Sequence, residues 1–152
     1  MAKLKKQHMT IHWKAIVQDD SSIPATEATL KEKATLVGRI GLMMLSVGTG
    51  AWRVRNSMNK VSRCLGITCT ADIGLLAISY TCIEGTDTYT QSISLPTTGV
   101  NTHKLMELEL FMKEFPDKVS TCSVKHIHEV LDEIQKFPAN YKAWNLGLAS
   151  AL

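Results

Sequence analysis

The strongest constraint on the fold is a change, made twice along the chain, in the spacing of the apolar residues. Between residues 36 and 65 they recur every three or four positions, which is the period of a helix with one buried face. Between 67 and 95 they alternate with polar residues, which is typical of strands buried on one side. Helical spacing returns between 105 and 134. The predicted order is therefore two helices, three strands and two helices, ααβββαα.

A glycine-rich break separates the two helices that precede the strands. The apolar face of the first comprises Leu36, Val37, Ile40, Met43, Met44 and Val47. The second is expected over 51–65. Its apolar face comprises Val54, Met58, Val61 and Leu65. Gly48 and Gly50 precede this helix, where backbone N–H groups could bind an anion, but we favour the simpler interpretation that they turn the chain.

Three strands are expected over 67–74, 75–82 and 88–95. In the first, odd-numbered residues are apolar and most even-numbered residues are polar, so one face is predicted to be buried. The segment EGTD at 84–87 is expected to turn the chain, because Gly85 can adopt a positive φ, and the last two strands then form an antiparallel hairpin. These elements predict an α+β fold in which about four helices cover a small antiparallel sheet of about three strands.

Two further helices are expected after the strands. Asn101 is a good N-cap for the third helix, and Pro116 is expected to end it. Ser123 and Pro138 bound the fourth helix in the same way. The apolar faces of these helices comprise Leu105, Leu108, Met112 and Phe115 in the third, and Ile127, Val130, Leu131 and Ile134 in the fourth.

The composition indicates a single folded domain with a sizeable core. Of the 152 residues 45% are hydrophobic, and the net charge is only +3. No long run of Lys and Arg occurs, so nucleic acid is not expected as a partner. The N-terminus lacks the pattern of a signal peptide, and no segment has the roughly 20 uninterrupted apolar residues that span a bilayer.

The sequence divides into three parts. Residues 1–33 mix charged and polar side chains and are expected to be a flexible lead-in. Residues 34–138 contain the predicted helices and strands. After Lys142 charge disappears, and small and apolar residues follow, which is typical of the start of a membrane helix. A frayed apolar tail explains 139–152 equally well.

The common catalytic and nucleotide-binding signatures are absent from the sequence. There is no GxSxG, HExxH, P-loop or GxGxxG motif. The four cysteines are scattered without the spacing of a zinc site, so no metal and no cofactor is expected. His128 and Asp132 are predicted to form an exposed pair on one helix. Asp72 stands near a strand end, where a carboxylate can do acid–base chemistry but more often caps or turns the chain.

The side of helix 51–65 opposite its apolar face combines an aromatic residue with cations. Arg53, Lys60 and Arg63 cluster there, and Trp52 projects near them. One explanation is that Trp52 packs over its own neighbours with Arg53 stacked beside it. The other is a binding surface, because Trp and Arg are enriched at interface hot spots and suit the membrane–water boundary. We favour a surface that binds a partner.

Two consecutive segments resemble a known family. SVGTGAWRVRNSMNKVSRCLG, residues 46–66, and ITCTADIGLLAISYTC, residues 67–82, look like the N-terminal domain of the threonine/serine exporter family (ThrE/YjjP type). The positions that match its signature in identity or kind are Gly48, Trp52, Arg53, Val54, Leu65 and Gly66. A later segment, 97–111, is similar too, with Asn101 and Leu105 in place. The resemblance covers about residues 34–152.

The resemblance implies the cytoplasmic domain of a cell-membrane exporter of small hydrophilic metabolites, either amino acids such as threonine and serine or dicarboxylates. Its implied partner is the transmembrane part of the exporter or a separate membrane subunit, and a homo-oligomer is left open. The chain would then be a fragment, a truncated gene product or one component of a split transporter. The residues expected to bind a partner are Trp52, Arg53, Arg63, Asp72 and Asn101.

Two acidic positions of the family signature differ in this chain. The family's soluble domain has been proposed to be hydrolase-like, and the two glutamates of its signature are replaced here by Gly50 and Arg55. A chain that lacks both carboxylates is not expected to be an enzyme. The alternative function is a soluble hydrolase that uses strand-end residues such as Asp72.

Overall fold

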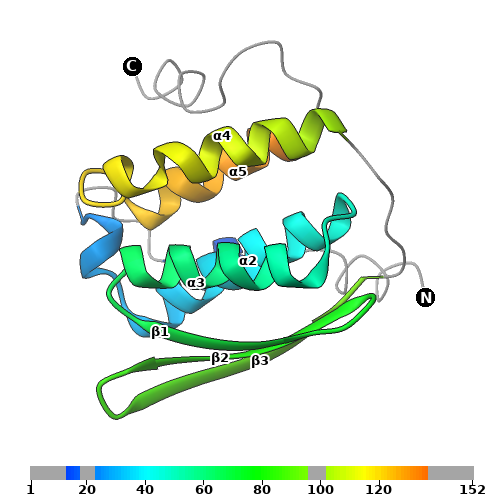
Figure 1. The fold of residues 1–152 in the computed structure, drawn as a ribbon. Coiled ribbons are helices and arrows are strands. Elements are labelled where there is room, and N and C mark those ends of the chain that lie inside the picture. Colours follow the sequence, from blue (N-terminus) through cyan, green and yellow to red (C-terminus); the bar gives the residue numbers. More distant parts are fainter. Residues whose placement is uncertain (1–12, 18–22, 96–101, 137–152) are drawn as a thin grey trace.

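The structure is a computed structural model that describes residues 13–17, 23–95 and 102–136. Figure 1 shows three stacked layers, which are a sheet, a middle pair of helices and an outer pair of helices. The middle pair is α2 (Leu30–Ser46) and α3 (Ala51–Cys64), and the outer pair is α4 (Thr102–Lys118) and α5 (Val124–Lys136). Two short 3-10 helices, η1 (Trp13–Ala15) and η2 (Ala25–Glu27), precede α2. The predicted α+β fold and the ααβββαα order are confirmed.

The sheet is antiparallel throughout. Its strands are β1 (Thr68–Ile73), β2 (Ala77–Glu84) and β3 (Asp87–Ser94), and they pair in the order β1-β2-β3. Gly85, in the turn between β2 and β3, has a φ of 62° as its place in the sequence predicted. The inner face packs on the middle helices and carries the buried side chains Cys69, Ile78, Tyr80, Cys82 and Ile93. The outer face carries mostly Thr and Ser, so the alternation of the sequence matches the two sides of the sheet.

Helix α2 is the centre of the molecule. Every residue from Glu32 to Leu45 is buried, because the sheet lies on one side of the helix and α5 on the other. Gly38 lets α2 approach the sheet closely, since a Cβ at this position would lie 2.1 Å from the hydroxyl oxygen of Tyr80. The Tyr80 hydroxyl donates a hydrogen bond to the carbonyl of Ala34 over 2.8 Å. Burial raises the pKa of this phenol far above its usual value.

The observed helix starts and ends differ from the predicted ones at two places. Helix α2 begins at Leu30 rather than near Leu36, because Thr29 and Glu32 form a capping box that starts the helix earlier. The preceding segment also contributes to the core, since Trp13 is buried. Helix α4 does not stop at Pro116 but continues to Lys118.

The continuation past Pro116 has a local cause. Proline removes one N–H donor from the helix, and only the last turn lies beyond it. The N–H of Val119 still donates to the carbonyl of Phe115 over 3.0 Å, and both side chains are buried. In α5, Ser123 is the predicted cap, and its Oγ accepts from the N–H of His126 at 3.1 Å. Asn101, Pro138 and the tail at 139–152 lie outside the described residues.

Candidate docking groove between α3 and α4

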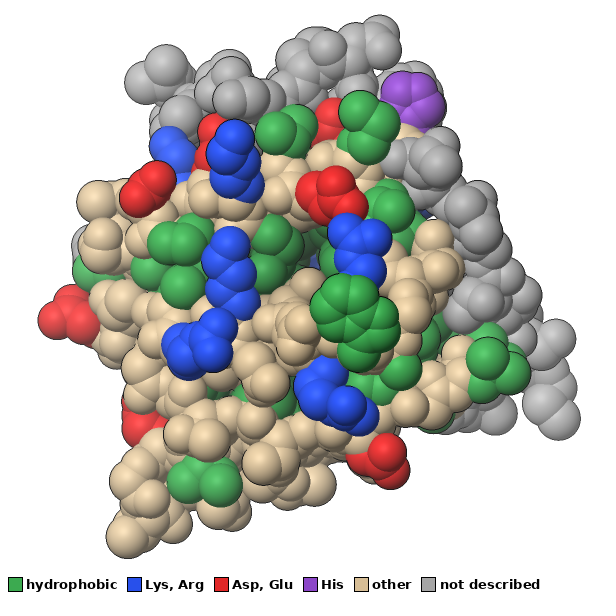
Figure 2. Space-filling view, viewed as in Figure 1, with side chains coloured by type: hydrophobic (Ala, Val, Ile, Leu, Met, Phe, Trp, Pro, Cys, Tyr) green, Lys and Arg blue, Asp and Glu red, His purple; other side chains and the backbone are tan. Residues whose placement is uncertain are grey.

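A groove of about 380 Å³ lies between the two helices on one face of the molecule. Its lining residues are Trp52, Arg53, Asn56, Ser57 and Lys60 from α3, Glu109, Met112 and Lys113 from α4, and Met44 from α2. Figure 2 shows Lys and Arg side chains gathered over this face, with exposed hydrophobic side chains among them. The groove therefore combines apolar walls with a rim of mostly positive charge.

Helix α3 presents these residues because its two sides are chemically different. Val54, Met58 and Val61 are fully buried, as the sequence predicted, and they fix which side of the helix faces the core. Trp52 and Lys60 are eight residues apart, so they lie roughly along the same side of the helix, which faces α4. The apolar stripe of α3 thus positions the groove residues without any direct contribution to binding.

Trp52 does not pack into its own domain. Its side chain is 66% exposed, and no hydrogen bond or ring contact joins it to another residue of the described part of the chain. Arg53 does not stack on it but forms an ion pair with Glu109 of α4 over 2.6 Å. The explanation in which Trp52 covers its neighbours with Arg53 stacked beside it is therefore wrong, and a large aromatic surface is left in contact with water.

The cations of the groove are only partly neutralised. Arg53 and Glu109 are 42% and 48% exposed, and an ion pair of this kind stabilises a fold by at most about 1 kcal/mol. Lys60 and Lys113 have no ion pair with any residue that the structure describes. The groove thus contains three cations and one carboxylate. It can accept an anionic group at little cost to the fold.

The structure separates the residues that the sequence assigned to a single binding surface. Trp52 and Arg53 share the groove, whereas Arg63 is exposed but does not line it. Asp72 lies on the outer face of the sheet, opposite Ser79 of β2. Asn101 lies outside the described residues. Whether any of these residues binds a partner stays a prediction.

The surroundings of Asp72 give little support to the hydrolase alternative. Asp72 is exposed, and no hydrogen bond or ion pair connects it to a histidine in the part of the chain described. Its cross-strand neighbour Ser79 hydrogen-bonds to the Ser92 hydroxyl over 3.0 Å. A serine in this position lacks the base that would activate it as a nucleophile.

A buried polar junction joins the same two helix layers at α2 and α5. One guanidinium nitrogen of Arg39 donates to the carbonyl of His128 over 3.0 Å and lies 3.1 Å from its Nδ1. The other donates to Gln135 over 2.7 Å and to Asp132. The Trp13 ring stacks on the imidazole with centroids 4.8 Å apart. The sequence missed this junction, because it depends on which helices pack together.

The prediction that His128 and Asp132 form an exposed pair is wrong. His128 is fully buried, and Asp132 binds Arg39 instead. Burial, and secondarily the nearby Arg39 charge, lower the pKa of His128 well below its ordinary value of 6.5. Burial also lowers the pKa of Arg39, and the hydrogen bond and the charge of Asp132 oppose that shift. The imidazole is therefore neutral and belongs to the fold rather than to a surface site.

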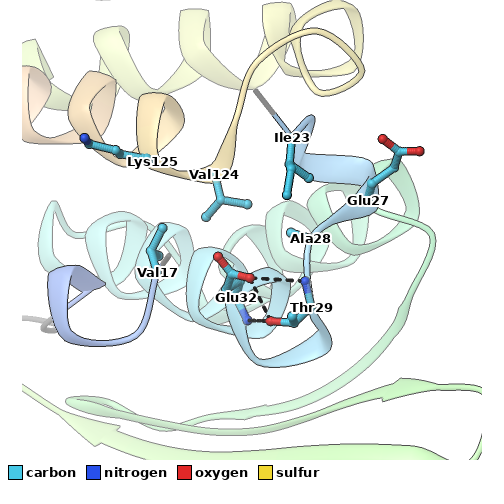
Figure 3. Close-up of a pocket in the computed structure, with 8 residues that line it drawn as sticks. All are labelled: Val17, Ile23, Glu27, Ala28, Thr29, Glu32, Val124 and Lys125. Atoms are coloured by element: carbon cyan, nitrogen blue, oxygen red, sulfur yellow. Dashed lines mark hydrogen bonds between the residues drawn. The ribbon is translucent and has the colours of Figure 1, made fainter. Parts of the chain in front are cut away.

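A second, smaller cavity of about 70 Å³ lies where η2 and the start of α2 approach α5. Figure 3 shows Val17, Ile23 and Val124 around it, with the Glu32 carboxylate drawn back toward Thr29. The backbone N–H and the hydroxyl of Thr29 donate to this carboxylate over 3.3 and 2.9 Å. Glu32 serves the helix cap, and the remaining lining combines the apolar Val17, Ile23, Ala28 and Val124 with Glu27 and Lys125.

Two properties of the described residues bear on the kind of site. Among residues 13–17, 23–95 and 102–136, no three His, Cys, Asp or Glu side chains gather where they could hold a metal ion. Within the same ranges, none of the helices combines the length and the apolar run needed to cross a bilayer. The candidate site is the α3–α4 groove, because it combines an exposed aromatic side chain with three cations.

A family model fits most of the chain. Residues 35–152 fit the model of the ThrE family, described as "Putative threonine/serine exporter". The chain belongs to the ThrE family. The matched segment includes α3, the sheet, α4 and α5, and thus both walls of the groove. No curated protein and no solved structure matches the chain. The description of the family indicates a role in transport.

Proposed function

We propose that this ThrE-family chain acts on the cytoplasmic side of a cell-membrane exporter, where it supports the assembly or regulation of export. The exported compounds are small hydrophilic metabolites, either amino acids such as threonine and serine or dicarboxylates. The observation that carries the proposal is the 66% exposed Trp52 at a cationic groove inside the segment that matches the exporter family. An aromatic anchor beside guanidinium and ammonium groups is typical of a binding hot spot.

The partner that fits this groove is the membrane-spanning part of the exporter, whether it belongs to the same polypeptide or to a separate subunit. Trp52 provides apolar contact area, and Arg53, Lys60 and Lys113 provide donors for acidic groups. Trp and Arg are also suited to the boundary between membrane and water. Docking would bury Trp52 and exchange the weak pair between Arg53 and Glu109 for contacts with the partner.

An efflux assay tests the transport role. Cells are loaded with labelled threonine or serine, and release is followed with the intact gene, with the gene deleted and with the Trp52→Ala variant. We expect deletion and Trp52→Ala both to slow release. Leu75→Ala is the matched control, because Leu75 is 87% exposed and lies outside the groove. Its release is expected to equal that of the unchanged protein.

The two arms of this assay fail separately. If deletion of the gene leaves the release of both amino acids unchanged, they are not the exported compounds and the threonine/serine form of the proposal is wrong. If deletion slows release while Trp52→Ala does not, export stands and the docking role of the groove is wrong. The amount of protein in the membrane fraction is measured for each variant, so that a loss of folding is not mistaken for a loss of docking.

A further inference from the structure

Strand β3 forms an edge of the sheet, and its outward backbone groups are unpaired among the described residues. Along an edge strand, the backbone groups of successive residues point alternately toward the neighbouring strand and away from it. The N–H of Leu95 donates to the carbonyl of Leu76 over 2.7 Å, so Leu95 points toward β2. Odd-numbered residues of β3 therefore bond to β2. The N–H and C=O groups that point to the open edge belong to Thr88, Thr90, Ser92 and Ser94. Four donors and four acceptors are thus available side by side.

The opposite edge of the sheet is different. The bond from the N–H of Gly74 to the carbonyl of Ala77, at 2.7 Å, shows that odd-numbered residues of β1 point outward. Among these, Ala71 has a carbonyl that accepts from Nε of Arg55 over 3.3 Å. The side chain of Arg55, from α3, thus covers part of this edge. Among the residues that the structure describes, β3 offers a complete row of such groups and β1 does not.

Strand β3 also lacks the features that usually prevent an exposed edge strand from pairing with another chain. Such edges carry lysines, prolines or bulges. Apart from Asp87, its first residue, β3 contains no charged residue and no proline. The eight pairs between β2 and β3 run without interruption from Glu84 and Asp87 to Ala77 and Ser94, so no bulge bends the edge. The edge is therefore open to an added strand.

We propose that β3 pairs antiparallel with β3 of a second copy of this chain, with Gln91 opposite Gln91. In this register Thr88 faces Ser94 of the other copy and Thr90 faces its Ser92. All eight outward groups of each copy are then bonded, and the two sheets become one of six strands. On the outer face, the hydroxyl groups of neighbouring strands already lie side by side, since the Oγ1 atoms of Thr81 and Thr90 are 2.9 Å apart. The dimer would extend this arrangement across the new strand pair.

The side chains of the strand are compatible with pairing between two copies. On the inner face, Gln91 meets itself, and its side-chain amide lies 2.8 Å from the Tyr80 hydroxyl, whose single proton is donated to the Ala34 carbonyl. One amide N–H then donates to the Tyr80 oxygen, and the remaining N–H and the amide oxygen can bond to Gln91 of the other copy. Asp87 would lie opposite Leu95, so the two Asp87 carboxylates stay roughly 27 Å apart at the strand rise of an antiparallel sheet. The pairing thus brings no like charges together.

Sedimentation velocity on the 152-residue chain tests this pairing. We expect the mass to rise with protein concentration from 16.8 kDa to twice that value. Thr90→Pro removes an outward N–H and leaves the bonds to β2 intact, so this variant is expected to remain a monomer with an unchanged far-UV spectrum. Thr90→Val is the matched control, because it removes the hydroxyl but keeps the N–H, and it is expected to dimerise.

A cross-linking experiment tests the register without any loss of backbone bonding. Gln91 faces Gln91 at a non-hydrogen-bonded pair, where the Cα atoms are about 4.5 Å apart and within reach of a disulfide. Under mild oxidation by a copper–phenanthroline complex, Gln91→Cys is expected to yield a covalent dimer, and Thr70→Cys, on the exposed face of β1, is not. A monomer at every concentration, a Thr90→Pro dimer with a native spectrum, or equal cross-linking of both cysteine variants would overturn the proposal.

Discussion

Two arginines cross from the middle to the outer layer of helices, and they do so in opposite environments. Arg39 reaches from α2 to α5, is 4% exposed and binds His128, Asp132 and Gln135. Arg53 reaches from α3 to α4, is 42% exposed and has a single ion pair. The polar link between the two layers is therefore buried at α2 and α5 and exposed to solvent at α3 and α4.

This difference assigns different roles to the same side chain. A buried guanidinium whose donors are used holds its neighbours in one arrangement, because removing it leaves their polar groups without partners. An exposed guanidinium in a weak ion pair can exchange its partner with little loss of folding free energy. The α2–α5 junction thus stabilises the fold, and the α3–α4 groove is available for binding. The following predictions test this contrast, from the largest expected effect to the smallest.

Replacement of the two arginines gives the largest difference. We expect Arg39→Met to lower the free energy of unfolding by about 3 kcal/mol or more, because Asp132, Gln135 and the His128 carbonyl lose their donor. Arg53→Met is expected to lower it by less than about 1 kcal/mol. Urea denaturation of both variants measures the two values. Equal losses would show that the junction and the groove do not differ in this way.

The close approach of α2 to the sheet gives the next effect. Gly38→Ala places a methyl group against the Tyr80 hydroxyl, which two hydrogen bonds hold in place. We expect a loss of about 1–3 kcal/mol, although alanine is the better helix former. Ser57→Ala, in the groove wall of α3, is expected to change stability by less than about 0.5 kcal/mol. Thermal unfolding compares them, and a neutral Gly38→Ala would contradict the tight packing of α2.

The buried imidazole predicts a pH dependence of stability. Because the pKa of His128 is lower in the folded than in the unfolded chain, the unfolded state binds more protons as the pH falls below about 6.5. The free energy of unfolding is therefore unaffected by His128 above this pH. Below it, His128 lowers the free energy of unfolding by up to about 1.4 kcal/mol per pH unit.

Denaturation between pH 7 and pH 5 measures this slope. His128→Gln is expected to flatten the profile, whatever its effect on stability at neutral pH. His103→Gln, at an exposed position on α4, is expected to keep the profile of the unchanged chain. If both variants retain the slope, another group is responsible and His128 is not the titrating residue.

Local spacing was enough to predict much of the fold. The face of α3 formed by Val54, Met58 and Val61 and the alternation of β1 follow from the period of each element, and both are observed. The glycine break before α3 was also predicted, and it is confirmed by the positive φ of Gly48, which is 89°. The exposure of Trp52 follows from the same helical period.

The parts that were missed depend on which helices pack together. Glu109 and Lys113 complete the groove, but nothing near them in the sequence indicates that α4 lies against α3. His128 stands four residues after Val124 and three before Leu131, within the apolar stripe of α5. Arg39 occupies the same kind of position in α2, between Leu36 and Ile40. A polar residue inside an apolar stripe was the available signal for the buried junction.

Photocross-linking from position 52 tests the docking role of the groove most directly. Trp52 is replaced in cells by a photoreactive benzoyl analogue of phenylalanine, and the same analogue at Leu75 serves as the control. The account predicts an adduct from position 52, identified by mass spectrometry, with a membrane-spanning segment of the exporter, and none from position 75. Adducts only with soluble proteins, or the same membrane adduct from both positions, would contradict it.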